Sequence, residues 1–180
     1  AEQAGRMQRL VEDLLTLSPL ETDRPPQEER IDMTALVQTR AAEARALSAG
    51  RHDIRVHADG PAFLLGSGPE IHSALGNLAS NAVRYTPEGG QVTLRWEART
   101  DSAAFTVEDT GIGIDPRHIP RLTERFYRVD RGRSRDSGGT GLGLAIVKHV
   151  LERHQARLHV ASEPGRGSQF AAIFPLRRVG

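Results

Sequence analysis

The stretch 77–87 reads Asn-Leu-Ala-Ser-Asn-Ala-Val-Arg-Tyr-Thr-Pro, and it closes a segment whose apolar residues recur with helical spacing. This periodicity predicts a helix over 69–85 that turns its apolar face toward a core. A polar arc adjoins that face, and its members are Asn77, Asn81, Arg84 and Tyr85. Their spacing of i, i+4, i+7 and i+8 puts them on one side of the helix.

Two Asn residues on one side of a helix need a reason, because Asn is a mediocre helix former. Its amide oxygen is a hard, neutral ligand that suits a Mg²⁺ ion already held by phosphate oxygens. Arg84 can neutralise a phosphate, and Tyr85 offers a ring to a base or a ribose. Taken alone, the same arc also fits a solvated polar face with an incidental tyrosine.

Two glycine-containing stretches follow. Residues 109–114 read Asp-Thr-Gly-Ile-Gly-Ile after an expected strand, where glycines allow a close approach to a flat ligand and Asp109 can accept a hydrogen bond from an exocyclic amine. Residues 138–144 read Gly-Gly-Thr-Gly-Leu-Gly-Leu before an expected helix over 141–155. Free N–H groups and the dipole at such a helix start favour a phosphate. A tight turn and a flexible hinge are the ordinary alternatives.

A basic segment, 121–135, lies between the two glycine stretches. Its six arginines stand against Glu124 and Asp130, a local charge of +4. They are Arg121, Arg125, Arg128, Arg131, Arg133 and Arg135. A long cationic stretch that leads into an anion site favours a mobile lid, although a solvated charge run is the usual alternative. The order of the four features, within about 70 residues, describes one nucleotide pocket.

The remaining pattern predicts the fold class. Expected helices at 34–47, 69–85 and 141–155 alternate with expected strands at 53–58, 63–66, 91–98, 103–108, 158–161 and 169–174. Consecutive strands joined by short turns favour an α+β fold, a two-layer sandwich in which helices cover one face of a mixed, mostly antiparallel sheet. A polar stretch with two prolines at 21–30 predicts a linker between residues 1–20 and a compact unit at 31–180.

The first segment, 1–20, carries an apolar stripe with spacings of 3 and 4. Its members are Met7, Leu10, Val11, Leu14 and Leu17. This spacing fits either an ordinary terminal core helix or the tail of a helix from a dimerising hairpin.

Composition excludes several classes of function. The 180 residues have a net charge of +1, and aromatic residues make up 4%, so neither a general attraction to nucleic acid nor a base-stacking surface is expected. No cysteine is present, which excludes disulfides and thiolate metal sites. No apolar run approaches the ~20 residues that cross a bilayer, so no membrane contact is expected.

Residues 31–180 resemble the catalytic ATP-binding domain of bacterial sensor histidine kinases, which belongs to the Bergerat-fold group (GHKL) shared with gyrase, Hsp90 and MutL. The matching motifs are the N box at 77–87, the first glycine box at 109–113, the F box at 124–128, the second glycine box at 139–145 and a last glycine motif at 165–168. Residues 6–21 resemble the end of the second helix of the dimerisation and phosphoacceptor domain. The run 121–150 is especially similar to the phosphate-regulon sensor kinase subgroup.

The resemblance implies ATP and Mg²⁺ as ligands, and it implies roles on the adenine side of the site. Asp109 would take the adenine amine, and Tyr85 would pack near adenine or ribose. Gly111 and Gly113 would form the floor of the pocket, next to Ile114. Ser168 stands where the family usually has Thr.

On the phosphate side, the resemblance implies that Asn81 ligates Mg²⁺ with support from Asn77, and that Arg84 and Arg128 reach phosphates. Phe126 would anchor the lid next to Tyr127. The phosphates would lie against Gly139, Thr140, Gly141, Leu142, Gly143 and Leu144.

At two points this sequence differs from the pattern of the fold group or of the kinase family, and both differences narrow the expected activity. ATP-hydrolysing members of the group have a Glu four residues before the Mg²⁺-binding Asn, where this chain has Asn77. An amide cannot accept a proton at neutral pH, so slow hydrolysis is expected. None of the seven histidines has the sequence context of the family's phosphoacceptor, so we expect a fragment that binds ATP without phosphorylating itself.

The function implied by the resemblance is transfer of the ATP γ-phosphoryl to a histidine on a phosphoacceptor helix of the same or a partner protomer, and then to a response regulator. The subgroup similarity implies phosphate sensing as the process. The intact protein would be a homodimer, and this part of it would be the cytoplasmic portion of a sensor anchored in the inner membrane. The alternatives are an ATPase of the gyrase or MutL kind and a non-catalytic nucleotide-binding or dimerisation module.

Overall fold

The computed structural model describes residues 2–20, 25–129 and 139–180. In chain order the main elements are α1 (Glu2–Leu20), β1 (Glu29–Asp32), α2 (Met33–Ser48), β2 (Asp53–Ala58), β3 (Phe63–Gly66), α3 (Gly68–Tyr85), β4 (Gln91–Arg99), β5 (Ser102–Asp109), α4 (Gly143–Arg153), β6 (Arg157–Glu163) and β7 (Gly167–Pro175). Short 3-10 helices span Ile119–Arg121 and Leu176–Arg178. The predicted α+β class is confirmed.

The main sheet has the strand order β2-β4-β5-β7-β6. The β2–β4 pair is parallel, and the other neighbours are antiparallel. The sheet is therefore mixed and mostly antiparallel, as predicted. Its register sets Asp109, the last residue of β5, opposite Ser168 of β7, so two segments far apart in sequence meet at one end of the sheet.

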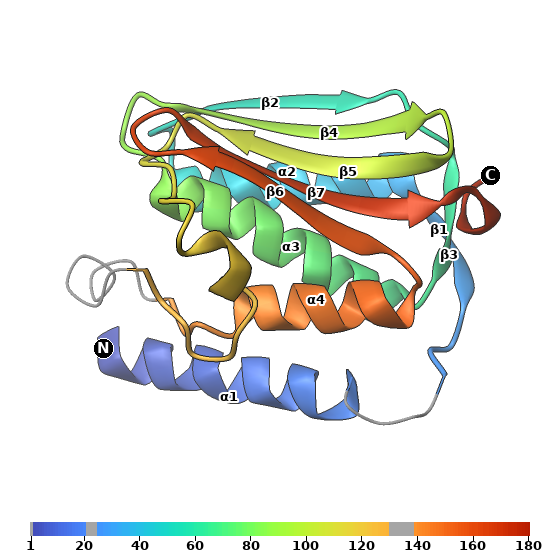
Figure 1. The fold of residues 1–180 in the computed structure, drawn as a ribbon, viewed down its shortest axis with the longest axis horizontal. Coiled ribbons are helices and arrows are strands. Elements are labelled where there is room, and N and C mark those ends of the chain that lie inside the picture. Colours follow the sequence, from blue (N-terminus) through green and yellow to red (C-terminus); the bar gives the residue numbers. More distant parts are fainter. Residues whose placement is uncertain (1, 21–24, 130–138) are drawn as a thin grey trace.

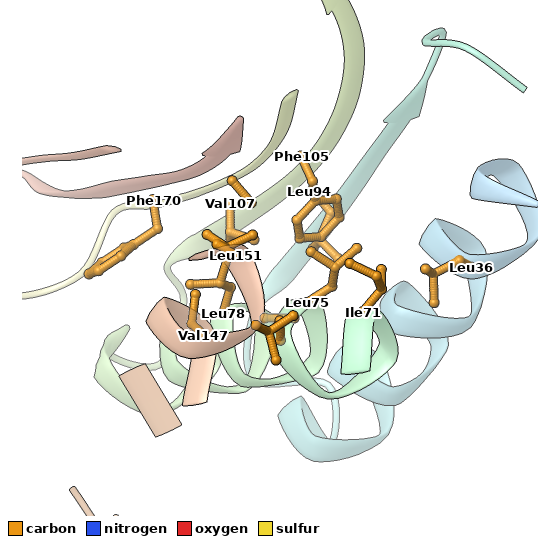
Figure 2. Packing of buried hydrophobic residues seen from close by; sticks show 14 of the residues in the cluster. Leu36, Ile71, Leu75, Leu78, Leu94, Phe105, Val107, Val147, Leu151 and Phe170 are labelled. Carbon is orange, nitrogen blue, oxygen red and sulfur yellow. The ribbon is translucent and has the colours of Figure 1, made fainter. Parts of the chain in front are cut away.

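Helices α2, α3 and α4 cover one face of this sheet, and α1 lies on the far side of α4 (Figure 1). The layers meet in a core where Ile71, Leu75 and Leu78 of α3 face Leu94 and Phe105 of the sheet (Figure 2). All five side chains are at most 1% exposed. Burial of this apolar face is the main force that holds α3 against the sheet, and it leaves the adjoining polar arc of α3 at the edge of the core.

Helix α2 shows how local sequence sets the helix ends. Asp32 is its N-cap and accepts a hydrogen bond of 2.9 Å from the backbone N–H of Ala35, which satisfies one of the free donors of the first turn. The helix ends at Ser48, and Ala49 takes the left-handed conformation with φ 49°. The helix therefore extends one residue beyond each end of the predicted range 34–47.

The sequence did not predict β1, whose first two residues lie inside the predicted linker 21–30. This strand pairs antiparallel with β3 in a separate two-stranded sheet. Ile31 is its buried residue, at 6% exposure. Arg178 reinforces the same end of the molecule, because its guanidinium donates to Glu28 Oε1 at 2.8 Å and to the Leu65 carbonyl oxygen at 3.0 Å.

Helix α1 divides the predicted apolar stripe between two faces. Leu17 and Leu20 are buried and Leu10 packs against the core. Their positions share one stripe with Asp13, at spacings of 3, 4 and 3. Met7, Val11, Leu14 and Leu15 are exposed. Among the described residues, no helix is long and apolar enough to cross a membrane.

Candidate nucleotide-binding site

A cavity of about 390 Å³ opens between the polar arc of α3, the end of β5, the glycine stretch before α4 and the segment 122–129. Most of the residues that the sequence singled out line it. They are Asn77, Asn81, Arg84, Tyr85, Asp109, Gly113, Ile114, Tyr127, Arg128, Gly139, Thr140, Gly141, Gly143, Leu144 and Ser168. The volume falls within the usual range for small-molecule sites.

Three of the residues that the resemblance assigns to the nucleotide do not line the cavity. Leu142 is fully buried, because it faces the core at the start of α4. Gly111 lies just behind the wall, and its backbone N–H donates to Asp109 Oδ1 at 2.8 Å. The side chain of Phe126 is 58% exposed, so it does not anchor the lid by burial. The backbone N–H of Phe126 instead donates to the Gly141 carbonyl oxygen at 2.9 Å.

The two Asn residues stand one turn apart on α3, at the cavity wall. The Asn77 side-chain amide donates to the Ser73 carbonyl oxygen at 3.0 Å, which fixes its orientation. Its Oδ1 lies so near Gly143 that a Cβ at that position would approach it to 2.6 Å. The first turn of α4 and the polar arc of α3 are therefore in direct contact, and a larger residue at 143 would displace the amide.

Asp109 is the acidic group at the sheet end of the cavity. Burial raises the pKa of its carboxyl to about 6, although hydrogen bonds from the backbone of Gly111 and Ser168 act in the opposite direction. At pH 7 the group is mostly ionised and able to accept a hydrogen bond from a ligand. Such a carboxylate, partly removed from water and aimed into a cavity, is typical of a recognition position.

Close backbone packing holds the wall around Asp109. Gly113 has φ +68° and Gly167 has φ +112°, both in the region that favours glycine. A Cβ at Gly113 would clash with the Glu163 carbonyl oxygen, and one at Gly167 would clash with the Asp109 carbonyl oxygen, each well inside van der Waals contact, so no side chain fits at either position. Ser162 ties the same turn together, since its Oγ accepts from the Ile114 N–H at 2.8 Å.

The glycine stretch leads into α4 at the opposite side of the cavity. Gly141 has φ +77°, and a Cβ there would come within 2.9 Å of Phe126 Cα. The helix begins at Gly143, two residues later than predicted, because the left-handed Gly141 cannot be part of it. The free N–H groups and the dipole at this helix start lie at the cavity and suit an anion.

Part of the predicted lid is described. Tyr127 lines the cavity, its hydroxyl lies 2.5 Å from His118 Nδ1, and the Arg121 guanidinium stacks on its ring at 4.3 Å. Arg128 also lines the cavity. Arg121 and Arg125 of the lid do not line it. Outside the described residues lie Arg131, Arg133 and Arg135 of the lid and Gly138 of the glycine stretch.

Sequence reasoning missed two charged residues of the lining, Arg9 and Asp13 of α1. Thr140 donates from its hydroxyl to Asp13 Oδ2 at 2.5 Å. The available signal was the position of Asp13 inside the apolar stripe of α1. Ser80, Ala82, Thr86, Pro87, Ile112, Leu122, Val129 and Phe170 also line the cavity without having been singled out.

The donor set limits how a metal could be held. Within 2–20, 25–129 and 139–180, no three His, Cys, Asp or Glu residues gather in a group that could bind a metal ion. An amide oxygen at the cavity wall is the kind of ligand that can complete the shell of a magnesium ion carried mainly by phosphate oxygens. The residues present therefore fit Mg²⁺ that enters with a nucleotide, and they do not form a metal site by themselves.

The sheet order, the helical layer and the glycine-lined cavity place the chain among α+β nucleotide-binding domains. A family model described as histidine kinase-, DNA gyrase B-, and HSP90-like ATPase matches residues 66–178. The chain belongs to this family.

Named relatives and a solved structure agree with the family. The phosphate regulon sensor protein PhoR of Pseudomonas aeruginosa is 54% identical over 99% of this chain and 41% of its own length. The sensor-like histidine kinase SenX3 of Mycobacterium tuberculosis is 40% identical over 96% of this chain and 43% of its own. The crystal structure of full-length ShkA in complex with AMPPNP superposes with a TM-score of 0.82 at 27% identity, covering 96% of this chain and 36% of that one. The chain thus spans about two fifths of the curated relatives it matches.

Proposed function

We propose that this chain is the ATP-binding catalytic domain of a two-component sensor histidine kinase, which transfers the ATP γ-phosphoryl group to a histidine on a phosphoacceptor helix. The observation that carries the proposal is the single cavity in which Asp109, Asn81 and the glycine stretch before α4 meet. The 54% identity to a phosphate regulon sensor protein supports phosphate sensing as the process that the intact protein serves.

In this proposal the sheet end of the cavity binds the base. The Asp109 carboxylate accepts a hydrogen bond from the adenine amine, a donor that guanine lacks at the corresponding position. Gly113, Tyr85 and Ser168 border the ring, and Gly111 orients the Asp109 carboxylate through its backbone N–H. The raised pKa of Asp109 reflects burial that a hydrogen-bonding base would compensate.

The phosphates then extend toward α4. Gly139, Gly141 and Gly143 leave room for them at the helix start, while Arg84 and Arg128 neutralise their charge. Asn81 is the ligand that we assign to Mg²⁺, and Asn77 positions the polar arc beside it. The metal would supply charge neutralisation at the phosphate oxygens. The protein's contribution to transfer is alignment of the γ-phosphoryl with the acceptor imidazole.

Slow hydrolysis is part of the proposal. Asn77 stands where the ATP-hydrolysing members of the group have the Glu that activates water. Its amide cannot accept a proton from water at neutral pH. A steady phosphate-release assay distinguishes the kinase from an ATPase of the gyrase or MutL kind. Release of phosphate at rates typical of an ATPase, in the absence of a phosphoacceptor, would contradict the assignment as a kinase.

The intact protein would work as a homodimer, and its partner would be a response regulator that receives the phosphoryl group on an aspartate. We place this domain on the cytoplasmic side of a sensor anchored in the inner membrane. Transfer can be tested by adding a phosphoacceptor hairpin from a relative in trans and following labelled phosphate. Label on the hairpin histidine supports the kinase, and ATP binding without any transfer would favour a non-catalytic nucleotide module.

Calorimetric titration tests the site itself. Asp109→Asn and Asn81→Asp should each remove most of the ATP affinity. The first replaces the anionic acceptor for the adenine amine with a neutral amide that has only one acceptor oxygen, and the second adds a charge among the phosphates. Asp101→Asn, in the exposed turn between β4 and β5, is the matched control and should bind normally. Unaltered affinity in both site variants would refute the assignment.

A further inference from the structure

Tyr127 is held at the cavity wall by two residues of one short turn. Its hydroxyl lies 2.5 Å from His118 Nδ1, and the Arg121 guanidinium stacks on its ring at 4.3 Å. Tyr127 lines the cavity, whereas neither His118 nor Arg121 does. Both contacts therefore reach a wall residue from outside the cavity, where they can fix its position without touching a ligand.

The turn that carries His118 is attached to the body of the domain. It continues into the 3-10 helix Ile119–Arg121, and both Ile119 and Leu122 pack against the main core. The backbone N–H of His118 donates to the Asp115 carbonyl oxygen at 2.9 Å, which closes the turn. The histidine is therefore a fixed point to which a neighbouring segment can be tied.

The neighbouring segment, residues 126–128, carries backbone strain and is called the tyrosine segment below. Phe126 has a φ of +62°, in the left-handed region that bulky residues rarely adopt. Such a conformation persists only where the surrounding contacts impose it. One of these contacts is the hydrogen bond of 2.9 Å from the Phe126 N–H to the Gly141 carbonyl oxygen. The bond between Tyr127 and His118 is a second contact, and it holds the tyrosine segment from its other side.

The base side of the cavity has supports of its own. The Ile114 N–H donates to Ser162 Oγ at 2.8 Å, and the Ile112 carbonyl oxygen accepts the Gly165 N–H at 2.8 Å. Neither hydrogen bond involves His118. Loss of the histidine should therefore release the tyrosine segment while leaving the part of the cavity that we assign to adenine in place.

We propose that His118 is a positioning residue for the phosphate end of the cavity: its bond to the Tyr127 hydroxyl fixes the tyrosine segment, so that Arg128 is in place before the nucleotide arrives. The proposal rests on the proposed function, because it takes the cavity as an ATP site and Arg128 as a phosphate ligand. A segment that is ordered in advance loses less conformational entropy on binding. The gain in affinity should be confined to ligands that carry phosphates.

His118→Leu is the direct test, because leucine is apolar and cannot hydrogen-bond to the tyrosine. We expect the affinity for AMPPNP with Mg²⁺ to fall about fivefold, the scale of one hydrogen bond, and the affinity for adenosine to stay unchanged. His118→Asn should restore most of the AMPPNP affinity, since its amide offers both a donor and an acceptor close to the place of Nδ1. His159→Leu is the matched control. His159 is exposed on β6, away from the cavity lining, and its substitution should alter neither affinity.

A double-mutant cycle tests whether His118 acts through the tyrosine. Tyr127→Phe removes the hydroxyl and keeps the ring, so it should lose a similar factor in AMPPNP affinity. Because it breaks the same bond from the other side, the inference stays testable even if His118→Leu does not fold. In the Tyr127→Phe background, His118→Leu should cause no further loss. Additive losses would overturn the proposal, since His118 would then act by another route.

The outcomes separate the inference from the proposed function. Unchanged AMPPNP affinity in His118→Leu or in Tyr127→Phe would overturn the inference, and so would an equal loss for adenosine and AMPPNP, which would indicate a general disturbance of the fold. His118→Asn that binds AMPPNP no better than His118→Leu would also count against it. Failure of the unmodified chain to bind either ligand would instead overturn the assignment of the cavity to ATP, and the inference would fall with it.

Discussion

The Asp109 carboxylate and the backbone N–H of Gly111 form a hydrogen bond of 2.8 Å that closes a turn at the end of β5. The bond holds one carboxylate oxygen and leaves the group oriented toward the cavity. It does not compensate fully for burial, since the pKa of Asp109 is still raised to about 6. The first prediction follows from this imbalance.

Adenosine binding should weaken as the pH falls through 6, because a protonated Asp109 no longer offers an anionic acceptor to the adenine amine. Between pH 7.5 and pH 5 we expect a loss of about tenfold, the scale of one pH unit below the pKa. Adenosine is the suitable probe because its phosphate-free structure does not titrate in this range. The Asp109→Asn variant should bind adenosine weakly at both pH values. If its adenosine affinity still depends on pH, a group other than Asp109 is responsible for the titration.

The same pKa shift predicts an effect on stability. Because the folded pKa of Asp109 lies above the unfolded value of 3.8, its ionisation disfavours the fold, fully so above pH 6. Asp109→Asn should therefore raise the free energy of unfolding at pH 7 in the absence of nucleotide. Urea titration at pH 7 and at pH 3.5 would check this, with the gain from the substitution expected to shrink at the lower pH.

His154 should give the opposite pH dependence. Its Nε2 accepts the Ser67 N–H at 3.0 Å, and its Nδ1 lies 2.7 Å from the Val150 carbonyl oxygen, so the neutral ring satisfies both partners. Burial lowers the pKa of this imidazole below 6.5. The stability it contributes is present above pH 6.5 and is lost as the pH falls through the lowered folded value.

The effect of His154 is best measured in the Asp109→Asn background, where the competing titration is absent. In that background stability should fall as the pH drops below 6.5, and addition of His154→Gln should flatten the response. A pH dependence that is the same with and without the histidine would contradict the assignment.

Gly141 and Gly165 provide a matched pair for testing the glycine stretch, because both have φ +77°. An alanine at either position should cost about 1–2 kcal/mol of stability from the left-handed backbone, and Gly141→Ala should cost more than Gly165→Ala because its Cβ would come within 2.9 Å of Phe126 Cα. Only Gly141 lines the cavity and lies against Phe126, whereas a Cβ at Gly165 meets nothing within 4 Å. Gly141→Ala should therefore lose at least about tenfold in ATP affinity, or 1.4 kcal/mol, and Gly165→Ala should bind normally. Similar ATP affinity in both variants would contradict the assignment of the glycine stretch to the nucleotide-binding site.

The end of α2 offers a prediction on stability alone. Ala49 carries a left-handed φ of 49° that an L-residue adopts at a cost. Ala49→Gly should raise the free energy of unfolding by about 0.5–1 kcal/mol, and Gly50→Ala should lower it by a similar amount. Chemical denaturation of the two variants beside the unmodified chain would test the pair, and changes of the same sign in both would contradict the explanation.

The sequence predicted the elements that carry strong periodicity or glycine signals. Helix α3 was expected at 69–85 and spans Gly68–Tyr85, because its apolar face is continuous and Pro87 follows closely. The α+β class and the mostly antiparallel sheet also followed from local patterns. The β1 strand was missed, because its short polar sequence forms a strand only through pairing with β3 and the burial of Ile31.

The cavity was predictable to the extent that its residues carry chemistry in a recognisable order. Leu142 shows the limit of a motif, since its neighbours line the cavity while its own side chain is buried in the core. The contact between Asp13 and Thr140 could not be predicted, because 127 residues separate the two positions and the place of Asp13 in the apolar stripe does not indicate which element it packs against. Such contacts depend on tertiary packing alone.

The burial of Leu17 and Leu20 fixes one end of α1 against the core, while Asp13, further along the same helix, contacts Thr140. These two side chains hold the C-terminal end of the helix in the core, and Asp13 stands about 10 Å from Leu20 along the axis. A tilt of about 15° about that end would carry the carboxylate about 3 Å, enough to break its bond to Thr140. A small change in the tilt of α1 would thus be felt directly at the glycine stretch before α4.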